Sequence, residues 1–183
     1  VVTFNADLED TKRLCFVGQD TFQSGRAAAG LMNEMTGGKG QVVIISGQVA
    51  NPGLISRQKG FTTEIKDSFP GLEVVDIRYS YDDEWVASKI VEELLEIYPE
   101  LTGIYITGHG VKGVCQTLKK LEKNSSIHVI ANDFLEENKK WLQDGTINFL
   151  IGQDAAVQGH SPVMILFQLL FDSRRRNFSI QIL

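Results

Sequence analysis

Short apolar runs alternate with helix-length amphipathic segments along most of this chain, and this alternation constrains the fold more than any other feature. The runs are rich in Val and Ile, and most are apolar at consecutive positions: Arg13–Gly18, Val42–Ser46, Val74–Arg78, Gly103–Thr107, His128–Asn132 and Ile147–Gly152. Strands that are buried on both faces of a parallel sheet have this pattern. The runs therefore predict the strands of one open sheet.

Helical segments lie between the runs, at Thr21–Met35, Ile55–Phe69, Glu84–Tyr98, Val111–Lys123 and Leu135–Asp144. Residues that end helices follow the first three: Gly37-Gly38, Pro70 and Pro99. Asp82-Asp83 precede the third segment as candidate caps. The strict alternation predicts an α/β fold, an open parallel sheet flanked by helices and joined by right-handed crossovers.

The two ends of the chain do not fit this repeating unit. Val1–Asn5 reads as a strand with nothing before it. Ala155–Phe171 reads as a long apolar helix that is followed only by a weak strand, Phe178–Leu183. We therefore expect the chain to be a piece of a longer protein.

The composition excludes several classes of protein. The 183 residues are 43% hydrophobic, which suffices for one ordinary core. The net charge of −5 disfavours general binding to nucleic acid. No apolar run approaches the roughly 18 residues of a membrane span, and the first residues show no signal peptide. Cys15 and Cys115 lie in apolar runs, which favours buried free thiols in a reducing compartment.

Polar side chains follow the predicted strands, at the edge where open α/β sheets bind ligands. In chain order they are Asp20 and Thr21, Arg57 in the next helix, Tyr81, His109, Asp133 and Gln153. Carboxylates, a planar guanidinium, an amide and an aromatic face suit a small polyhydroxylated ligand. Taken singly, Asp20 could be a helix cap, His109 a loop residue and Tyr81 rim packing.

Arg57 is expected at an open cleft, where its planar fork would hold two ligand oxygens and its truncation would leave the fold intact. The alternative is a surface ion pair with a carboxylate such as Glu84.

One motif has a second interpretation. Gly108–Gly113 matches G-x-G-x-x-G after a predicted strand, and Asp133 ends the next strand, as in a dinucleotide fingerprint. That fingerprint normally lies in the first strand–helix unit, whereas this match follows the fourth run. No G-x-S-x-G, Walker or H-E-x-x-H motif occurs, and His109, His128 and His160 lack partners at ligand spacing, so we expect no metal and no cofactor. The basic run Arg174–Arg176 is interpreted as a solvated helix end.

An ordered set of motifs runs through nearly the whole chain: Val1–Asn5, Val17-Gly18-Gln19-Asp20 with Gly25-Arg26-Ala27-Ala28, Arg57-x-x-Gly60-Phe61, Val129–Asp133 and Gln153-Asp154-x-x-x-Gln158-Gly159. Together they resemble the LacI/GalR repressor family and its periplasmic sugar-binding relatives. The resemblance implies two α/β lobes that are joined by hinge strands and close on a small ligand. It implies that residues 8–153 form the C-terminal lobe. Residues 1–7 and 154–177 would be hinge strands and a helix of the N-terminal lobe, with a terminal strand at 178–183.

The resemblance also implies a set of ligand-binding residues: Asn5, Asp20, Thr21, Arg57, Tyr81, Asp133 and Gln153. Gly108 stands where the family usually has Asn, and His109 replaces the Asp that follows it. The family's usual sugar contacts differ here, so no particular sugar is predicted.

We therefore expect the effector-binding domain of a cytoplasmic bacterial transcriptional regulator of the LacI/GalR type, without enzymatic activity. It would bind a sugar-like effector, form a homodimer through the C-terminal lobe, and reach DNA only through an N-terminal domain absent from this chain. The apolar face Val111–Leu118, with few expected partners in the lobe, favours the dimer. The first alternative is the extracytoplasmic sugar-binding protein of an ABC transporter, which free cysteines disfavour. A dinucleotide-binding enzyme is the second alternative.

Overall fold

The computed structural model describes residues 1–7 and 11–171, and within it the chain divides into two compact units. Among the described residues, one unit is 21–152, and the other is 1–7, 11–20 and 153–171. The predicted strand Phe178–Leu183 and the basic run Arg174–Arg176 lie outside the described residues. The resemblance to the LacI/GalR family implies that these units are parts of a C-terminal and an N-terminal lobe, and this assignment stays a prediction.

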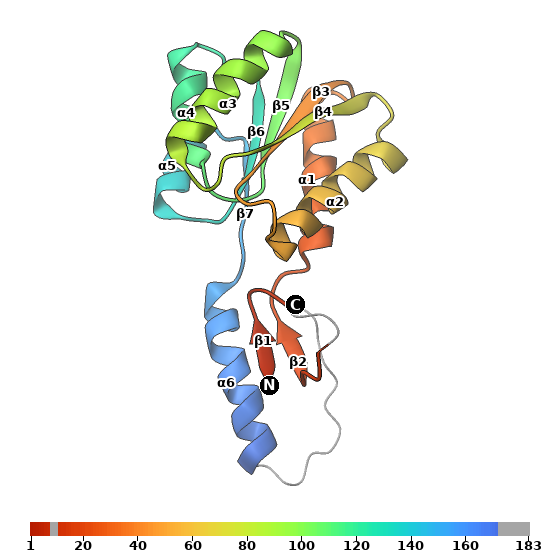
Figure 1. The fold of residues 1–183 in the computed structure, drawn as a ribbon, viewed down its shortest axis with the longest axis vertical. Helices are drawn as coiled ribbons and strands as arrows, with labels where there is room; N and C mark the ends of the chain where they lie inside the picture. The colour runs from red at the N-terminus through yellow and green to blue at the C-terminus, as the bar shows by residue number, and fades with distance from the viewer. Residues whose placement is uncertain (8–10, 172–183) are drawn as a thin grey trace. The chain divides into compact units, whose positions relative to one another are not determined.

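The larger unit is a five-stranded parallel sheet in the order β4-β3-β5-β6-β7 (Figure 1). Its strands are β3 (Gly40–Ser46), β4 (Leu72–Tyr79), β5 (Leu101–Ile106), β6 (His128–Asn132) and β7 (Phe149–Ile151). Helices α1 (Thr21–Thr36) and α2 (Pro52–Ser68) cover one face. Helices α3 (Glu84–Ile97), α4 (Val111–Lys120) and α5 (Glu136–Gln143) cover the other. The predicted α/β architecture is confirmed.

The prediction that Arg13–Gly18 joins this sheet is wrong. The run forms only a three-residue strand, β2 (Cys15–Val17), which pairs in parallel with β1 (Val2–Phe4) in a separate two-stranded sheet. An apolar run shows that a strand is buried but not which strand it pairs with. The smaller unit also holds helix α6 (Ala155–Phe171), whose bounds are those predicted.

Helix α6 is apolar and carries Pro162 in its interior. Several large side chains on it are exposed, among them Val163, Phe167, Leu170 and Phe171. No helix in the described part of the chain is both long and apolar enough to cross a bilayer.

Most predicted elements agree with the structure to within a few residues, and caps explain where helices α2 and α3 begin. Helix α3 begins at Glu84 as predicted, because the Asp83 carboxylate accepts hydrogen bonds from the amides of Trp85 and Val86 at 2.8 and 2.9 Å. Helix α2 begins three residues earlier than predicted. Asn51 caps it through the amides of residues 53 and 54, and Pro52 occupies its first turn.

Two apolar cores hold the sheet between its helices. Ala28, Met32 and Phe61 meet the α1–α2 face of the sheet. On the opposite face, the side chains of α3 and α4 meet strands β3, β5 and β6. The expectation that Val111–Leu118 has few partners in its lobe is wrong: its apolar side chains, Val111, Val114, Cys115 and Leu118, are all buried in this second core. This helix face therefore offers no argument for a homodimer.

Both cysteines are free, and they lie in different units. Burial raises the pKa of the Cys115 thiol, so this group is held as an inert neutral thiol in the core.

Glycines let the helices of one layer approach at backbone distance. A Cβ on Gly25 of α1 would lie 2.1 Å from the carbonyl oxygen of Arg57 on α2. A Cβ on Gly60 of α2 would lie 2.0 Å from the carbonyl oxygen of Phe22 on α1. The spacing of α1 and α2 is therefore set by two reciprocal backbone contacts that no side chain fits.

Gly25→Ala is expected to lower the free energy of unfolding by about 1–3 kcal/mol, because the added methyl group overpacks the α1–α2 contact. Gly30→Ala is the matched control in the same helix, since a Cβ there meets nothing within 4 Å. It should raise the free energy of unfolding by about 0.5–1 kcal/mol through helix propensity. Urea denaturation followed by circular dichroism measures both, and equal effects would contradict this account of the packing.

Candidate functional site

The carboxyl edge of the five-stranded sheet brings several predicted site residues into one unit. Tyr81 follows β4, His109 follows β5 and Asp133 follows β6, while Thr21 begins α1 and Arg57 lies on α2. Parallel strands end at the same edge, so crossover connections place these loops together. The other predicted residues, Asn5, Asp20 and Gln153, belong to the smaller unit.

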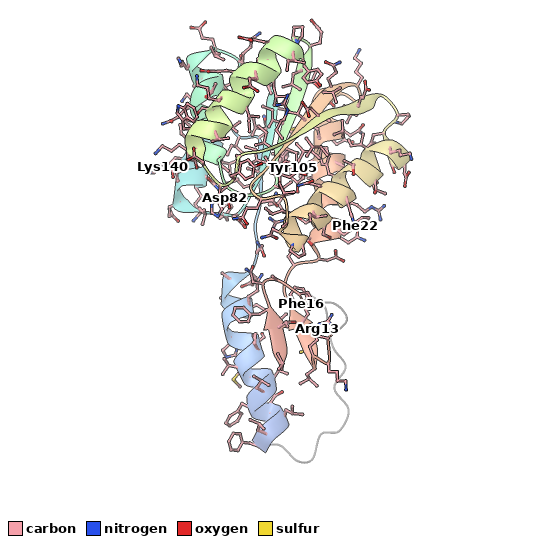
Figure 2. All side chains as sticks on the ribbon, in the orientation of Figure 1. Arg13, Phe16, Phe22, Asp82, Tyr105 and Lys140 are labelled. Carbon is pink, nitrogen blue, oxygen red and sulfur yellow. The ribbon has the colours of Figure 1, made fainter. Side chains whose placement is uncertain are left out.

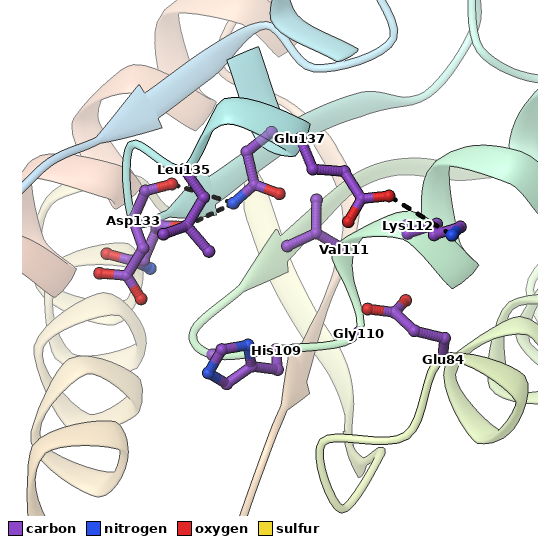
Figure 3. A pocket seen from close by; sticks show the side chains of 11 residues that line it. Glu84, His109, Gly110, Val111, Lys112, Asp133, Leu135 and Glu137 are labelled. Carbon is purple, nitrogen blue, oxygen red and sulfur yellow. Dashed lines mark hydrogen bonds and ion pairs between the residues drawn. The ribbon is translucent and has the colours of Figure 1, made fainter. Parts of the chain in front are cut away.

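A hollow opens at this edge between the loops that follow β5 and β6, at the start of α4 and α5 (Figure 3). We name it the β5–β6 hollow. It is lined by Glu84, Gly108, His109, Gly110, Val111, Lys112, Asn132, Asp133, Leu135, Glu137 and Asn138. Its volume of about 60 Å³ is well below the roughly 300–1,000 Å³ of a complete ligand pocket. Of the predicted residues in this unit, it gathers His109 and Asp133, while Thr21, Arg57 and Tyr81 lie outside its lining.

Asp133 is fixed by its backbone. Its φ of 69° is left-handed, a conformation that Asp tolerates better than most residues. Its amide donates to the carbonyl oxygen of Ile151 at 3.0 Å, and its own carbonyl oxygen accepts from Asn138 Nδ2 at 2.9 Å. The half-buried carboxylate is thus presented from a backbone that is held on both sides.

Asn138 is a site residue that sequence reasoning missed. It lies within the charged segment Glu136–Lys140 of α5, yet it is only 5% exposed. Its Nδ2 also approaches the Asn132 carbonyl oxygen, at 3.4 Å (Figure 3). A buried amide inside a polar helix carries no periodicity signal, so only the structure reveals it.

Charged side chains at the mouth of the hollow already interact with the protein. The Glu84 carboxylate accepts from the amide of Gly113 at 2.5 Å, and Lys112 pairs with Glu137 at 3.5 Å. His109 is exposed, and its carbonyl oxygen accepts from the Ser80 hydroxyl at 3.4 Å. The hollow therefore presents mixed charges and backbone groups, which suit a neutral polar ligand better than an ion.

Arg57 does not stand at an open cleft. It is 4% exposed, and its Nη1 donates to the carbonyl oxygen of Thr107 at 2.8 Å. Helix α2 turns this side chain toward the sheet, so Arg57 joins α2 to the end of β5. Neither the open-cleft expectation nor the proposed ion pair with Glu84 matches this arrangement.

Tyr81 is largely exposed to solvent, with 68% of its surface accessible, and its backbone has a left-handed φ of 54°. Beside it, Asp82 accepts from Gln48 Nε2 at 2.6 Å and so ties the loops after β3 and β4 together. Thr21 is half-buried at the first position of α1. These residues are at the predicted edge, and their contact with a ligand stays a prediction.

The residues of the smaller unit are described within that unit. Asn5 has a left-handed φ of 62°, and its amide donates to the Val17 carbonyl oxygen at 3.2 Å. Asp20 is exposed immediately before α1. Gln153 accepts from Gln158 Nε2 at 3.1 Å. Their participation in the site also stays a prediction.

The glycine motif at Gly108–Gly113 has a packing role. Gly110 caps α4 with a left-handed φ of 96°. A Cβ on Gly113 would lie 2.0 Å from the Glu84 carbonyl oxygen, so this glycine permits α3 and α4 to approach closely. The contacts of these glycines thus account for the motif without a dinucleotide. Within residues 1–7 and 11–171, no three His, Cys, Asp or Glu side chains gather in a way that could hold a metal ion.

Comparisons with known proteins agree on the fold. A family model described as periplasmic binding protein domain matches residues 1–173. A sugar-binding protein of a sugar ABC transporter from Bacillus halodurans is 26% identical, with a TM-score of 0.87, over 92% of this chain and 58% of its own. An ABC-transporter solute-binding protein from Burkholderia graminis, solved with D-arabinose, is 26% identical, with a TM-score of 0.86, over 96% and 62%.

GanP, a glucose-galactose binding protein from Geobacillus stearothermophilus, shares the fold at 24% identity, with a TM-score of 0.87 over 95% of this chain and 62% of its own. The chain thus spans about three fifths of the length of these structures. Among curated protein sequences, none matches it.

Arg57→Ala should lower the free energy of unfolding by about 2–3 kcal/mol, because it removes a buried charge-assisted hydrogen bond to Thr107. Lys59→Ala is the control on the same helix, since Lys59 is exposed, and it should change stability by less than about 0.5 kcal/mol. Urea denaturation measures both variants. An unchanged stability for Arg57→Ala would restore the open-cleft interpretation.

Proposed function

The chain belongs to the periplasmic binding protein domain family, and from that premise we propose that it binds a monosaccharide at the carboxyl edge of its five-stranded sheet. The family consists of binding proteins rather than enzymes. The observation that carries the proposal is the held Asp133 carboxylate in the β5–β6 hollow, in a fold shared with sugar-binding proteins at 26% identity.

The chemistry of this edge suits sugar hydroxyls. A carboxylate accepts hydrogen bonds from hydroxyl groups, and the edge adds the His109 ring and the exposed Tyr81 ring, whose face can cover C–H groups. The hollow is too small to enclose a whole sugar, so it holds only part of the ligand. We also propose Asn5, Asp20 and Gln153, which belong to the smaller unit, as ligand-binding residues.

As to biological role, we propose the sugar-binding protein of a transporter, which would act outside the cytoplasm. The solved structures similar to this chain that are named above are transporter or sugar-binding proteins, and this supports the alternative of the sequence analysis over the regulator. The cytoplasmic regulator is a second candidate, favoured by the two free cysteines. The upstream coding sequence separates the two: a helix-turn-helix there indicates the regulator, and a secretion signal indicates the transporter.

The sugar proposal predicts that Asp133→Asn weakens binding by about tenfold to a hundredfold, the range for losing a charge-assisted hydrogen bond. Asn keeps the left-handed backbone, so the fold should persist. Titration of isotope-labelled protein with D-arabinose, D-galactose and D-glucose, followed by NMR, gives the affinity and locates the shifted amides.

Glu73→Gln is the matched control, because Glu73 is an exposed acid at the start of β4, at the opposite edge of the sheet. It should bind as the wild type does. Equal affinities of wild type and Asp133→Asn would contradict the assignment of Asp133, and wild-type binding to none of the three sugars would contradict the proposal for sugars of this kind.

A further inference from the structure

A set of polar side chains is buried directly behind the proposed sugar site. Tyr105 of β5 is fully buried and stacks on Phe61, with ring centroids 4.7 Å apart. Asn132, the last residue of β6, is 1% exposed, and Ser24 of α1 is 6% exposed. Polar groups in a core are costly unless they are paired, so a set of three calls for an explanation.

Two of these side chains, Asn132 and Tyr105, meet at the Tyr105 hydroxyl. Asn132 Nδ2 donates to this oxygen at 3.2 Å and to the Ile106 carbonyl oxygen at 2.9 Å. Burial raises the pKa of Tyr105, and the hydrogen bond from Asn132 opposes that rise. Because the phenol oxygen accepts from Asn132, its own proton is left to be donated elsewhere.

Two acceptor atoms of this set are left over. Within the described part of the chain, Asn132 Oδ1 and Ser24 Oγ are buried and have no hydrogen-bond partner of normal geometry. The polar set is therefore under-satisfied, and each hydrogen bond that it does form matters more in this low-dielectric surrounding.

The placement of the set relates it to the site. Asn132 immediately precedes Asp133, and Ser24 lies one helical turn after Thr21. Tyr105, labelled in Figure 2, lies in the central strand β5. The chain continues from the end of β5 to His109. The set thus lies on the three elements that present Asp133, His109 and Thr21.

We propose that Tyr105, Asn132 and Ser24 are positioning residues of the sugar site. They would fix the end of β6, and with it Asp133, relative to the first turn of α1. This inference rests on the proposed function for its ligand. None of the three side chains needs to touch the sugar, so the set acts through Asp133 and Thr21.

Tyr105→Phe tests the proposal, because it removes the hydroxyl and keeps the stacking ring. Tyr98→Phe is the matched control: the Tyr98 hydroxyl also forms one hydrogen bond, which it donates to the Val75 carbonyl oxygen at 3.2 Å. This bond joins the end of α3 to β4, outside the set. Three quantities are measured by NMR and thermal unfolding: the affinity for D-arabinose, the unfolding midpoint, and the hydrogen-exchange rate of the Asp133 amide relative to that of Ile130.

Tyr105→Phe should weaken D-arabinose binding by about threefold to tenfold and speed the relative exchange of the Asp133 amide several-fold. Tyr98→Phe should change neither, and both variants should lose a similar amount of thermal stability, because each loses one hydrogen bond. A Tyr105→Phe protein that loses stability while its affinity and relative exchange stay at wild-type values would overturn the proposal and leave a purely structural role.

Two further outcomes are separated by this design. If the wild type does not bind D-arabinose, the proposed function fails for that sugar, and the relative exchange of the Asp133 amide still decides the positioning role. If Tyr105→Phe does not fold, Ser24→Ala removes the other end of the set and should speed the same exchange. Unchanged exchange in Ser24→Ala would then overturn the proposal.

Discussion

The burial of strands β3, β5 and β6 on both faces is the constraint on which the rest of the larger unit depends. Their apolar side chains alternate between two cores, so helices must cover the sheet on both sides. Parallel strands then require crossover helices, each of which returns the chain to the amino edge of the sheet. Every strand therefore ends at the same carboxyl edge. The loops that carry His109 and Asp133 meet there for this reason, before any ligand is considered.

Close backbone contacts make this layering compact. Gly25 and Gly60 allow α1 and α2 to touch, and Gly113 does the same for α3 and α4. The same short distances hold the starts of α1 and α4 at the carboxyl edge, where the proposed ligand contacts lie. Glycine in these helices therefore serves packing, and the match to a nucleotide-binding motif at Gly108–Gly113 is a consequence of that packing.

The candidate site is supported from behind by buried polar groups. Arg57 joins α2 to the end of β5, Asn138 holds the backbone of Asp133, and the Tyr105 hydroxyl meets Asn132 from β6. Such groups cost free energy unless they are paired, so their concentration at one edge is a specific feature of this edge. The fold places the β5–β6 hollow here, and the similarity to sugar-binding proteins supplies the proposed ligand class.

The sequence by itself determined the α/β class, the five helices of the larger unit, the strand His128–Asn132 and the cap at Asp83, because periodicity and capping are local properties. The sequence also predicted that His109 and Asp133 lie together at the carboxyl edge of the sheet. Only the tertiary structure decided that Cys15–Val17 pairs with Val2–Phe4, that Arg57 is buried, and that Asn138 belongs to the site. Strand partners and the direction in which a helix turns a side chain depend on contacts between distant residues, and no local pattern in the sequence encodes them.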